Sequence, residues 1–224
     1  RPNQSQYETT LYSLPEPVGK SVLENYHDPA VMEIRDEAIV DLGWRGLKGA
    51  ITEYNQKQFN KSIIIGGDIT IRKERMAIAS TKGMNDCDES TVLTASITSM
   101  IEMEKVKGTG WNTSTHISCF SPEEAGRESA ESAIRTRGGD RISSGTYDVI
   151  FGKQPVTDLF ANIVIPALSL SSINTSDTPF LGKLGQKISS ELLTVYDDGT
   201  IKGAIGSKKI SCEGIPTGRT DLIH

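Results

Sequence analysis

The stretch from Lys61 to Cys119 constrains the fold most, because its apolar and polar residues alternate in short runs separated by turn residues. Alternation at every second position is typical of β-strands that bury one face. The longest run, from Thr91 to Met103, indicates a strand with its other face in water. The shorter runs are residues 63–65, 69–71, 76–79 and 112–119. Together they predict a meander of about four antiparallel strands.

Turn residues set the expected boundaries of these strands. Gly66-Gly67-Asp68 predicts a bulge or tight bend, and residues 82–85 predict a hairpin turn. A second hairpin turn is expected at residues 108–110. His116 falls in the last expected strand, where a solvated or hydrogen-bonded imidazole is a commoner role than metal binding.

A helix is expected before the meander. Asp28-Pro29 opens a short one, and Asp36 is a better N-cap for a helix that continues to about Gln58. Three glycines lie three residues apart within it: Gly43, Gly46 and Gly49. A phosphate-binding loop would need a preceding strand, which the pattern does not offer. We therefore expect the glycines to allow close packing of this helix on the sheet, despite their low helix propensity.

A second helix is expected after the meander. The sequence Ser121-Pro122-Glu123-Glu124 is typical of a capping box with proline at the first helical position. The helix should end before Gly138-Gly139. Glu131 and Arg135 have the i,i+4 spacing of a solvent-exposed ion pair. The opposite face is mostly alanine and should lie close to the sheet: Ala125, Ala130 and Ala133.

The stretch from Arg141 to Asp198 begins with a strand signal and continues with a helix. The alternation of Tyr147, Val149 and Phe151 predicts a half-buried strand. Pro155 then opens a helix expected over residues 155–170, and Pro166 should kink or end it. The apolar residues of that helix recur at helical spacing: Leu159, Phe160, Ile163, Val164, Ala167 and Leu168.

The residues after this helix predict a loop, a strand and a turn. Residues 170–178 are rich in serine and threonine, which is typical of a flexible loop. A strand is expected at residues 192–196, followed by the turn Asp197-Asp198-Gly199. The two adjacent carboxylates could also form an acid/base pair. Neighbouring residues at a strand end point in opposite directions, which favours a structural turn.

Charge and hydropathy exclude two classes of partner. The chain has 224 residues, of which 24 are basic and 29 acidic, with a net charge of −5. The charges are well mixed, so the basic patch of a nucleic-acid binder is absent. The sequence also contains no apolar run near the ~20 residues of a membrane-spanning helix. We expect no nucleic-acid partner and no membrane partner.

Cysteines and acidic residues give no metal-site pattern. The three cysteines are far apart and odd in number, which favours isolated thiols in a reducing, cytoplasmic environment: Cys87, Cys119 and Cys212. The acidic cluster Asp86, Asp88 and Glu89 lacks the ordered spacing of a calcium-binding loop. It therefore predicts a solvated acidic loop.

Three motifs in fixed order carry a family resemblance. They are S-G-x-Y-D-V-x-F from Ser144, F-L-G-K-L-G-Q-K-I-x-S-x-L-L-T-V-x-D-D-G from Phe180, and G-S-x-x-x-x-x-E-G-x-P-T-x-R-T-x-L-I from Gly206. In this order they resemble the TldD and PmbA family, often called modulators of DNA gyrase, whose members behave as peptidases. The resemblance covers most of the chain. It implies an α+β fold with a largely antiparallel β-sheet and packed helices.

Catalytic TldD-like members of that family carry H-E-x-x-x-H on the helix, where the two histidines bind a metal and the glutamate is the general base. Five residues turn an ideal α-helix by about 500°, so such a helix must be locally distorted to aim both rings at one ion. The matching positions here are Ala161, Asn162 and Pro166. The only histidines are His27, His116 and His224, and no two lie within one helical turn. We therefore expect no catalytic residue, no metal ligand and no cofactor.

The resemblance implies a PmbA-like subunit without the metal motif, which acts with a TldD-like metallopeptidase subunit on small unfolded peptides in a homo- or hetero-oligomer. The expected domains are a linker at residues 1–27, a helix-and-meander domain at 28–140, and a truncated start of a C-terminal domain at 141–224. A stand-alone peptide-binding module without catalytic activity is one alternative. An enzyme with a different site is another, although the sequence has no nucleophile elbow, Walker loop or H-E-x-x-H to support it.

Overall fold

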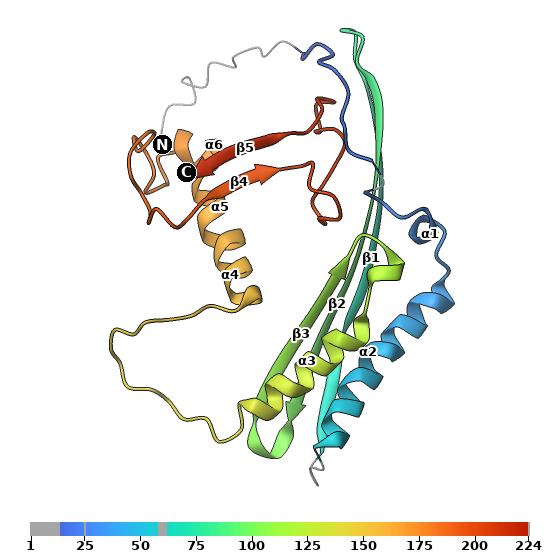
Figure 1. The fold of residues 1–224 in the computed structure, drawn as a ribbon, viewed down its shortest axis with the longest axis vertical. Coiled ribbons are helices and arrows are strands. Elements are labelled where there is room, and N and C mark those ends of the chain that lie inside the picture. The colour runs from blue at the N-terminus through green and yellow to red at the C-terminus, as the bar shows by residue number, and fades with distance from the viewer. Residues whose placement is uncertain (1–13, 25, 58–61, 224) are drawn as a thin grey trace, which may run out of the picture. The chain divides into compact units, whose positions relative to one another are not determined.

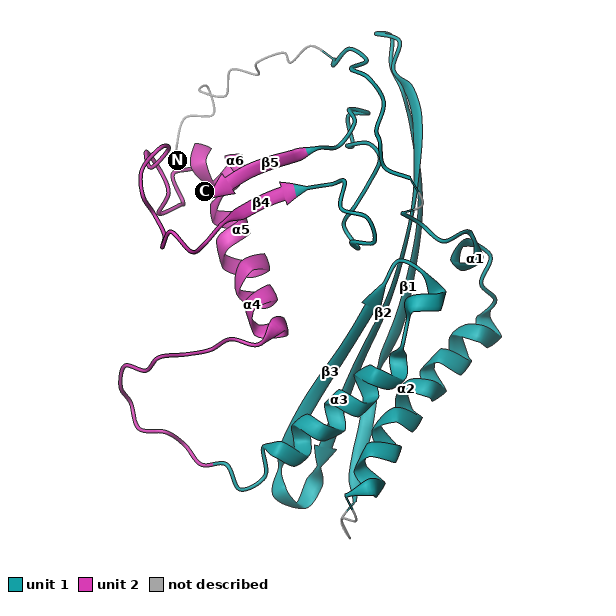
Figure 2. Ribbon diagram, in the orientation of Figure 1, with its two compact units in different colours: residues 1–139, 198–218 teal, residues 140–197, 219–224 magenta. Residues whose placement is uncertain are grey.

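A computed structural model describes the chain except for residues 1–13, 25, 58–61 and 224 (Figure 1). The predicted ends of the first long helix at Gln58 and of the first strand at Lys61, and His224, lie outside the described residues. The structure divides into two compact units, which Figure 2 shows in different colours. Unit 1 comprises residues 1–139 and 198–218, and unit 2 comprises residues 140–197 and 219–224. Helices and an antiparallel sheet together confirm the predicted α+β class.

Unit 1 contains an antiparallel sheet with the order β1-β2-β3. The strands are β1 (Ile63–Ala79), β2 (Asn85–Ile101) and β3 (Val106–Ser114). The predicted hairpin turn between β1 and β2 is confirmed, with the Ser80 amide donating to the Met84 carbonyl at 2.9 Å and Gly83 at φ +86°. The short helical turn η2 (Glu102–Glu104) joins β2 to β3, and η3 (Ile117–Cys119) follows β3.

The glycines of the sheet contradict two of the sequence predictions. Gly66 and Gly67 pair with Thr98 and Ile97 in one unbroken register, so the expected bend is absent and the runs from 63 to 79 form a single strand. A Cβ atom on Gly67 would lie 2.1 Å from the Ser96 carbonyl oxygen. Glycine is therefore needed here because the β2 backbone lies too close for a side chain. Gly108 and Gly110 lie within β3 and do not form a hairpin turn. The described sheet therefore has three strands, not about four.

Two long helices lie against one face of this sheet (Figure 1). They are α2 (Asp36–Gln56) and α3 (Pro122–Arg135). Arg35, not Asp36, is the N-cap of α2, so Asp36 is its first helical residue. The predicted alanine face of α3 is confirmed, because Ala125, Ala130 and Ala133 are all fully buried. The two helices meet so closely that a Cβ atom on Gly126 would lie 2.0 Å from the Gly46 carbonyl oxygen.

The start of α3 is where the sequence placed it, but without a complete capping box. Pro122 is the first helical residue, and the Glu124 amide donates to the Ser121 carbonyl at 3.0 Å. The Ser121 hydroxyl makes no capping bond, and the Glu124 carboxylate accepts from Arg127 at 2.9 Å instead. Proline and the acidic first turn therefore account for this helix start. Glu131 and Arg135 lie 3.8 Å apart, as predicted.

The N-terminal part of unit 1 contains the one-turn helix α1 (Pro29–Met32). Asp28 caps it, because its Oδ1 accepts from the Ala30 amide at 2.9 Å. The same residue binds the sheet region: its Oδ2 accepts from the Ile117 amide at 2.8 Å, and its own amide donates to Thr91 Oγ1 at 2.9 Å. The described residues before α1 form no helix or strand, yet Leu23 and Tyr26 are buried.

Unit 2 is built from short elements. A helix runs through α4 (Lys153–Leu159), the π-helical turn η4 (Phe160–Val164) and α5 (Ile165–Ala167), and α6 (Leu170–Asn174) follows it. The flexible loop predicted at residues 170–178 is therefore partly helical, with the Ser169 hydroxyl capping α6. The strand predicted from Tyr147 to Phe151 is wrong, because these residues form no strand and are exposed.

Two strands complete the described chain: β4 (Val195–Asp198) and β5 (Arg219–Ile223), which pair with each other. β4 begins three residues later than the predicted strand start at Leu192. The connection between the two strands, residues 199–218, packs within unit 1. None of the described helices is long and apolar enough to cross a membrane.

Candidate functional site

The helix that matches the metal-binding helix of the resembling family contains the π turn η4. The Ile165 amide donates to the Phe160 carbonyl, which is an i→i+5 bond in place of the α-helical i→i+4 bond. Pro166 follows at once. It has no amide to donate, and its ring would clash with the carbonyl four residues earlier. The proline therefore accounts for a wider turn at this point, and the helix ends at Ala167, close to where it was expected to kink or end.

The π turn bears directly on the H-E-x-x-x-H spacing. Ala161 and Pro166 are five residues apart, and an i→i+5 turn brings such positions toward the same side of the helix. The local distortion that the metal motif would require is thus present in this chain. The ligands are not: Ala161 and Pro166 have no side-chain donor atom. A metal ion bound by two imidazoles and activated beside a glutamate does not fit these residues.

Asn162 occupies the position of the family's general base and has a different contact. Its Nδ2 donates to the Asp158 carbonyl at 2.8 Å, one turn earlier in the same helix. An amide can neither take up a proton like a carboxylate nor bind a cation with a full negative charge. Asn162 therefore stabilises the backbone beside the π turn.

The described histidines lie in unit 1 and have local partners. His116 Nδ1 lies 2.9 Å from Thr115 Oγ1, just after the end of β3 and not within the expected strand. His27 Nε2 lies 3.3 Å from the Glu89 carboxylate. Among the described residues, no three His, Cys, Asp or Glu side chains gather in a way that could hold a metal ion. The expectation of no bound metal stays a prediction.

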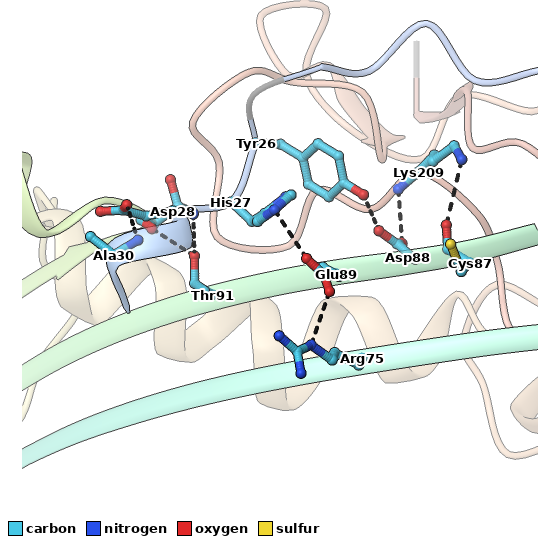
Figure 3. A network of polar contacts seen from close by, with 11 residues as sticks. Tyr26, His27, Asp28, Ala30, Arg75, Cys87, Asp88, Glu89, Thr91 and Lys209 are labelled. Carbon is cyan, nitrogen blue, oxygen red and sulfur yellow. Dashed lines mark hydrogen bonds and ion pairs between the residues drawn. The ribbon is translucent and has the colours of Figure 1, made fainter. Parts of the chain in front are cut away.

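The acidic cluster is not the solvated loop that the sequence predicted. Asp86, Asp88 and Glu89 lie at the start of β2, and Asp88 is only 5% exposed. Figure 3 shows Tyr26 and Lys209 reaching Asp88 from two separate segments of the chain. The prediction of a solvated loop failed because the partners of Asp88 are distant from it in the sequence.

These carboxylates have basic or hydroxyl partners within unit 1. Glu89 accepts from Arg75 at 2.9 Å, and Asp86 accepts from the Lys209 ammonium at 2.7 Å. That ammonium lowers the pKa of the Asp86 carboxyl below its usual value. Burial, followed by the hydrogen bond to Asp88, raises the pKa of the Tyr26 phenol, which keeps its hydroxyl a donor at ordinary pH.

The Asp197-Asp198-Gly199 segment has a turn role. Asp198 Oδ1 accepts from the Thr200 amide at 2.8 Å and from the Thr200 hydroxyl at 2.6 Å. The Gly199 amide donates to the Gly218 carbonyl at 3.2 Å. An aspartate that bonds the backbone two residues ahead is typical of a turn. The structure thus gives Asp198 the structural role that was favoured over a carboxylate pair.

A cavity of about 700 Å³ lies within unit 2 and is a candidate binding site that the sequence did not indicate. Its apolar lining comes from the end of α5, from α6, from the following loop and from β5: Leu168, Ile173, Phe180, Ile188, Leu222 and Ile223. Lys183 and Asp221 add charges of both signs to the wall. Cavities of this size and apolar character are typical of small-ligand and peptide side-chain sites. The lining motif from Phe180 to Ile188 is part of the family resemblance.

Comparison with known proteins gives a family match for the C-terminal part. Residues 144–224 match the family described as PmbA/TldA metallopeptidase C-terminal domain. A Methanothermobacter thermautotrophicus metalloprotease is 34% identical over 103 residues, 46% of this chain and 22% of that protein. An uncharacterised protein of Methanocaldococcus jannaschii is 25% identical over 202 residues, 90% of this chain and 47% of that protein.

Solved structures extend the likeness in fold to nearly the whole chain. A candidate modulator of a DNA gyrase from Thermotoga maritima superposes with a TM-score of 0.79 at 17% identity, covering 97% of this chain and 50% of that one. TldE from Thermococcus kodakarensis superposes with a TM-score of 0.70 at 18% identity, covering 95% and 47%. The chain therefore spans at most about half the length of these relatives.

Proposed function

Because this chain belongs to the TldD/PmbA family, which is of the metallopeptidase type, we propose that it is a PmbA-like subunit without a catalytic metal. It acts in a TldD/PmbA-type complex that degrades or matures small unfolded peptides. Catalysis takes place in a TldD-like partner. The observation that carries this proposal is the helix with the π turn η4, whose motif positions hold Ala161, Asn162 and Pro166 in place of two histidines and a glutamate.

The proposed division of labour follows from what peptide hydrolysis by a zinc enzyme needs. A Lewis acid, an activated water and a general base must meet in one cleft. At the three matched motif positions this chain supplies neither imidazole nor carboxylate, and Asn162 is bonded to its own helix. The subunit instead contributes scaffold and peptide contacts, for which the unit 2 cavity is the available surface.

The test separates metal content from activity. Purified, tag-free chain should contain zinc well below one equivalent by elemental analysis, and should cleave no peptide with or without added zinc. A mixture with its TldD-like partner should cleave unfolded peptides. Activity of the mixture should vanish when the partner's H-E-x-x-x-H is substituted and persist when Asn162→Ala is introduced here. Zinc-dependent cleavage by this chain alone would overturn the proposal.

A stand-alone peptide-binding module is the second candidate function. The 700 Å³ cavity favours it, because its apolar wall includes Leu222 and Ile223 of β5, a strand whose described pairing is with β4 alone. An extended peptide could place side chains in such a cavity. Native mass measurement of the cellular assembly discriminates between the two functions. A module that works alone binds peptide without a TldD-like protein, whereas the subunit is recovered together with one.

A further inference from the structure

The far half of the β1–β2 hairpin is the half next to its turn, where Arg72–Ala79 of β1 pairs with Asn85–Val92 of β2. It receives less packing from other elements than the near half, which contains Leu93–Ile101. β3 pairs only with Leu93–Ile101 of β2, so among the described residues no third strand lies beside the part of β2 from Asn85 to Val92. The buried core clusters that involve α2 and α3 also draw on the near half of β2, from Leu93 to Ile101. A two-stranded ribbon by itself is marginally stable in water. Something else must stabilise this half of the hairpin.

Loop 199–218, the connection between β4 and β5, covers one face of the far half. In this register the even-numbered residues of both strands share a face. Lys208 forms an ion pair with Glu74, and the Lys209 ammonium donates to Asp86 at 2.7 Å. At Gly214, which has φ +83°, a Cβ atom would lie 2.8 Å from Met84 Cγ. Every one of these hairpin contacts is to an even-numbered residue.

The segment Tyr26–Asp28 meets the same half of the hairpin at β2. The Tyr26 hydroxyl donates to Asp88, and His27 pairs with Glu89, the next residue of the strand. Successive strand residues point to opposite faces. Tyr26 therefore bonds a residue on the face covered by loop 199–218, whereas His27 pairs with a residue of the opposite phase; Figure 3 shows both contacts. The Asp28 amide completes the attachment through Thr91 Oγ1.

Asp88 is the residue that both segments share. Its Oδ1 accepts from the Tyr26 hydroxyl, and its Oδ2 accepts from the amides of Lys209 at 3.0 Å and Ile210 at 3.4 Å. Asp88 is 5% exposed, Tyr26 7% and Ile210 0%, so water does not replace a lost partner easily. A buried carboxylate left short of donors is costly.

We infer that Asp88 couples the Tyr26–Asp28 segment to loop 199–218, so that release of either segment loosens the other. Along the chain, the loop continues directly into Arg219 of β5, the strand that supplies Asp221, Leu222 and Ile223 to the unit 2 cavity. This coupling does not depend on the proposed subunit role.

The test measures amide hydrogen exchange in the full chain by peptide mass spectrometry. Tyr26→Phe removes one hydroxyl that bonds Asp88 rather than the loop. It should nevertheless speed exchange at residues 207–211, on the order of tenfold for a lost charged hydrogen bond. The matched control is Tyr147→Phe, which removes an exposed hydroxyl bonded to the Ser143 carbonyl at 2.7 Å in unit 2. It should leave both coupled segments unchanged.

The reciprocal variant perturbs the loop. Lys209→Gln removes the ion pair with Asp86 and should speed exchange in peptides that cover Tyr26–Asp28, whereas Lys187→Gln, which removes the exposed pair with Glu191, should not. Asp88→Asn should affect both segments, and if it fails to fold the two other variants still decide. Acceleration confined to the N-terminal segment in Tyr26→Phe, and to the loop in Lys209→Gln, would overturn the coupling.

Discussion

Leu93 in unit 1 and Leu184 in unit 2 have the same side chain in opposite surroundings, 0% and 101% exposed. The two units differ in the same way in how many of their residues are buried. Unit 1 buries apolar residues from both long helices and from the sheet. In unit 2 the described residues that are buried number three: Thr178, Val195 and Ile223.

The two units differ in whether the apolar face of a helix packs against another element. The alanine face of α3 meets β3 and α2 within unit 1, so pattern and packing agree. The helix α4–η4–α5 has an equally clear apolar pattern, yet Ile163 is 62% exposed. Large exposed apolar surfaces in a soluble domain mark contact sites. Unit 2 therefore presents apolar side chains that the described residues leave uncovered.

Replacing the two leucines tests the contrast most strongly. Leu93→Ala should lower the free energy of unfolding by about 2–5 kcal/mol, since it leaves a cavity in a closed core. Leu184→Ala should change it by less than about 0.5 kcal/mol. Urea unfolding followed by far-UV circular dichroism measures both. A comparable loss from Leu184→Ala would mean that this side chain is covered in solution, and the contrast between the units would break.

Two glycines in the long helices test how closely α2 and α3 pack in unit 1. A Cβ atom at Gly126 would lie 2.0 Å from the Gly46 carbonyl oxygen, whereas one at Gly43 would meet nothing within 4 Å. Gly126→Ala should therefore cost about 1–3 kcal/mol by forcing α2 and α3 apart. Gly43→Ala should add about 0.5–1 kcal/mol, because alanine favours the helix. Thermal unfolding followed by the fluorescence of the two tryptophans, Trp44 and Trp111, should show shifts of opposite sign. Equal signs would contradict the close helix contact.

The smallest effect is expected at the ion pairs of loop 199–218. Lys208 and Lys209 lower the pKa values of Glu74 and Asp86 below the unfolded values of about 4.3 and 3.9. A lowered folded pKa adds stability above the unfolded value, and this is lost as the pH falls through the folded value. Lys209→Gln should thus destabilise by about 0.2–1 kcal/mol at pH 6 and by less near pH 3. Urea midpoints at both pH values measure this, with Lys187→Gln as control. A penalty that grows in acid would refute it.

The sequence predicted the elements whose causes are local. Pro122 and the acidic turn after it place the start of α3, and the alternation from Thr91 to Met103 identifies β2. Two glycines led to a wrong prediction, because glycine is favoured both in turns and where two backbones approach closely. Gly108 and Gly110 fit a turn by residue type, but they are needed because α3 lies against β3, where a Cβ atom on Gly110 would be 2.0 Å from the Ala125 carbonyl oxygen. Tyr147–Phe151 alternates like a strand but pairs with no described strand.

The candidate sites were predictable to different degrees. The missing metal ligands at Ala161, Asn162 and Pro166 could be read directly, and the π turn has a signal in Pro166. The Asp88 junction could not be found in the same way, because its partners lie 62 and 121 residues away. The alternation gave no signal either, because Asp88 is in phase with Thr94, Ser96 and Thr98, which are less buried than their odd-numbered neighbours.

The position of β1 also affects behaviour at high protein concentration. In the order β1-β2-β3 it is an edge strand of 17 residues, and an edge of that length is a template for pairing with another copy. Asp68, Arg72, Lys73 and Arg75 interrupt its apolar residues with charge. Copies paired in parallel and in register would bring like charges together along the new ladder. These charged residues therefore oppose that mode of aggregation along the edge of the described sheet.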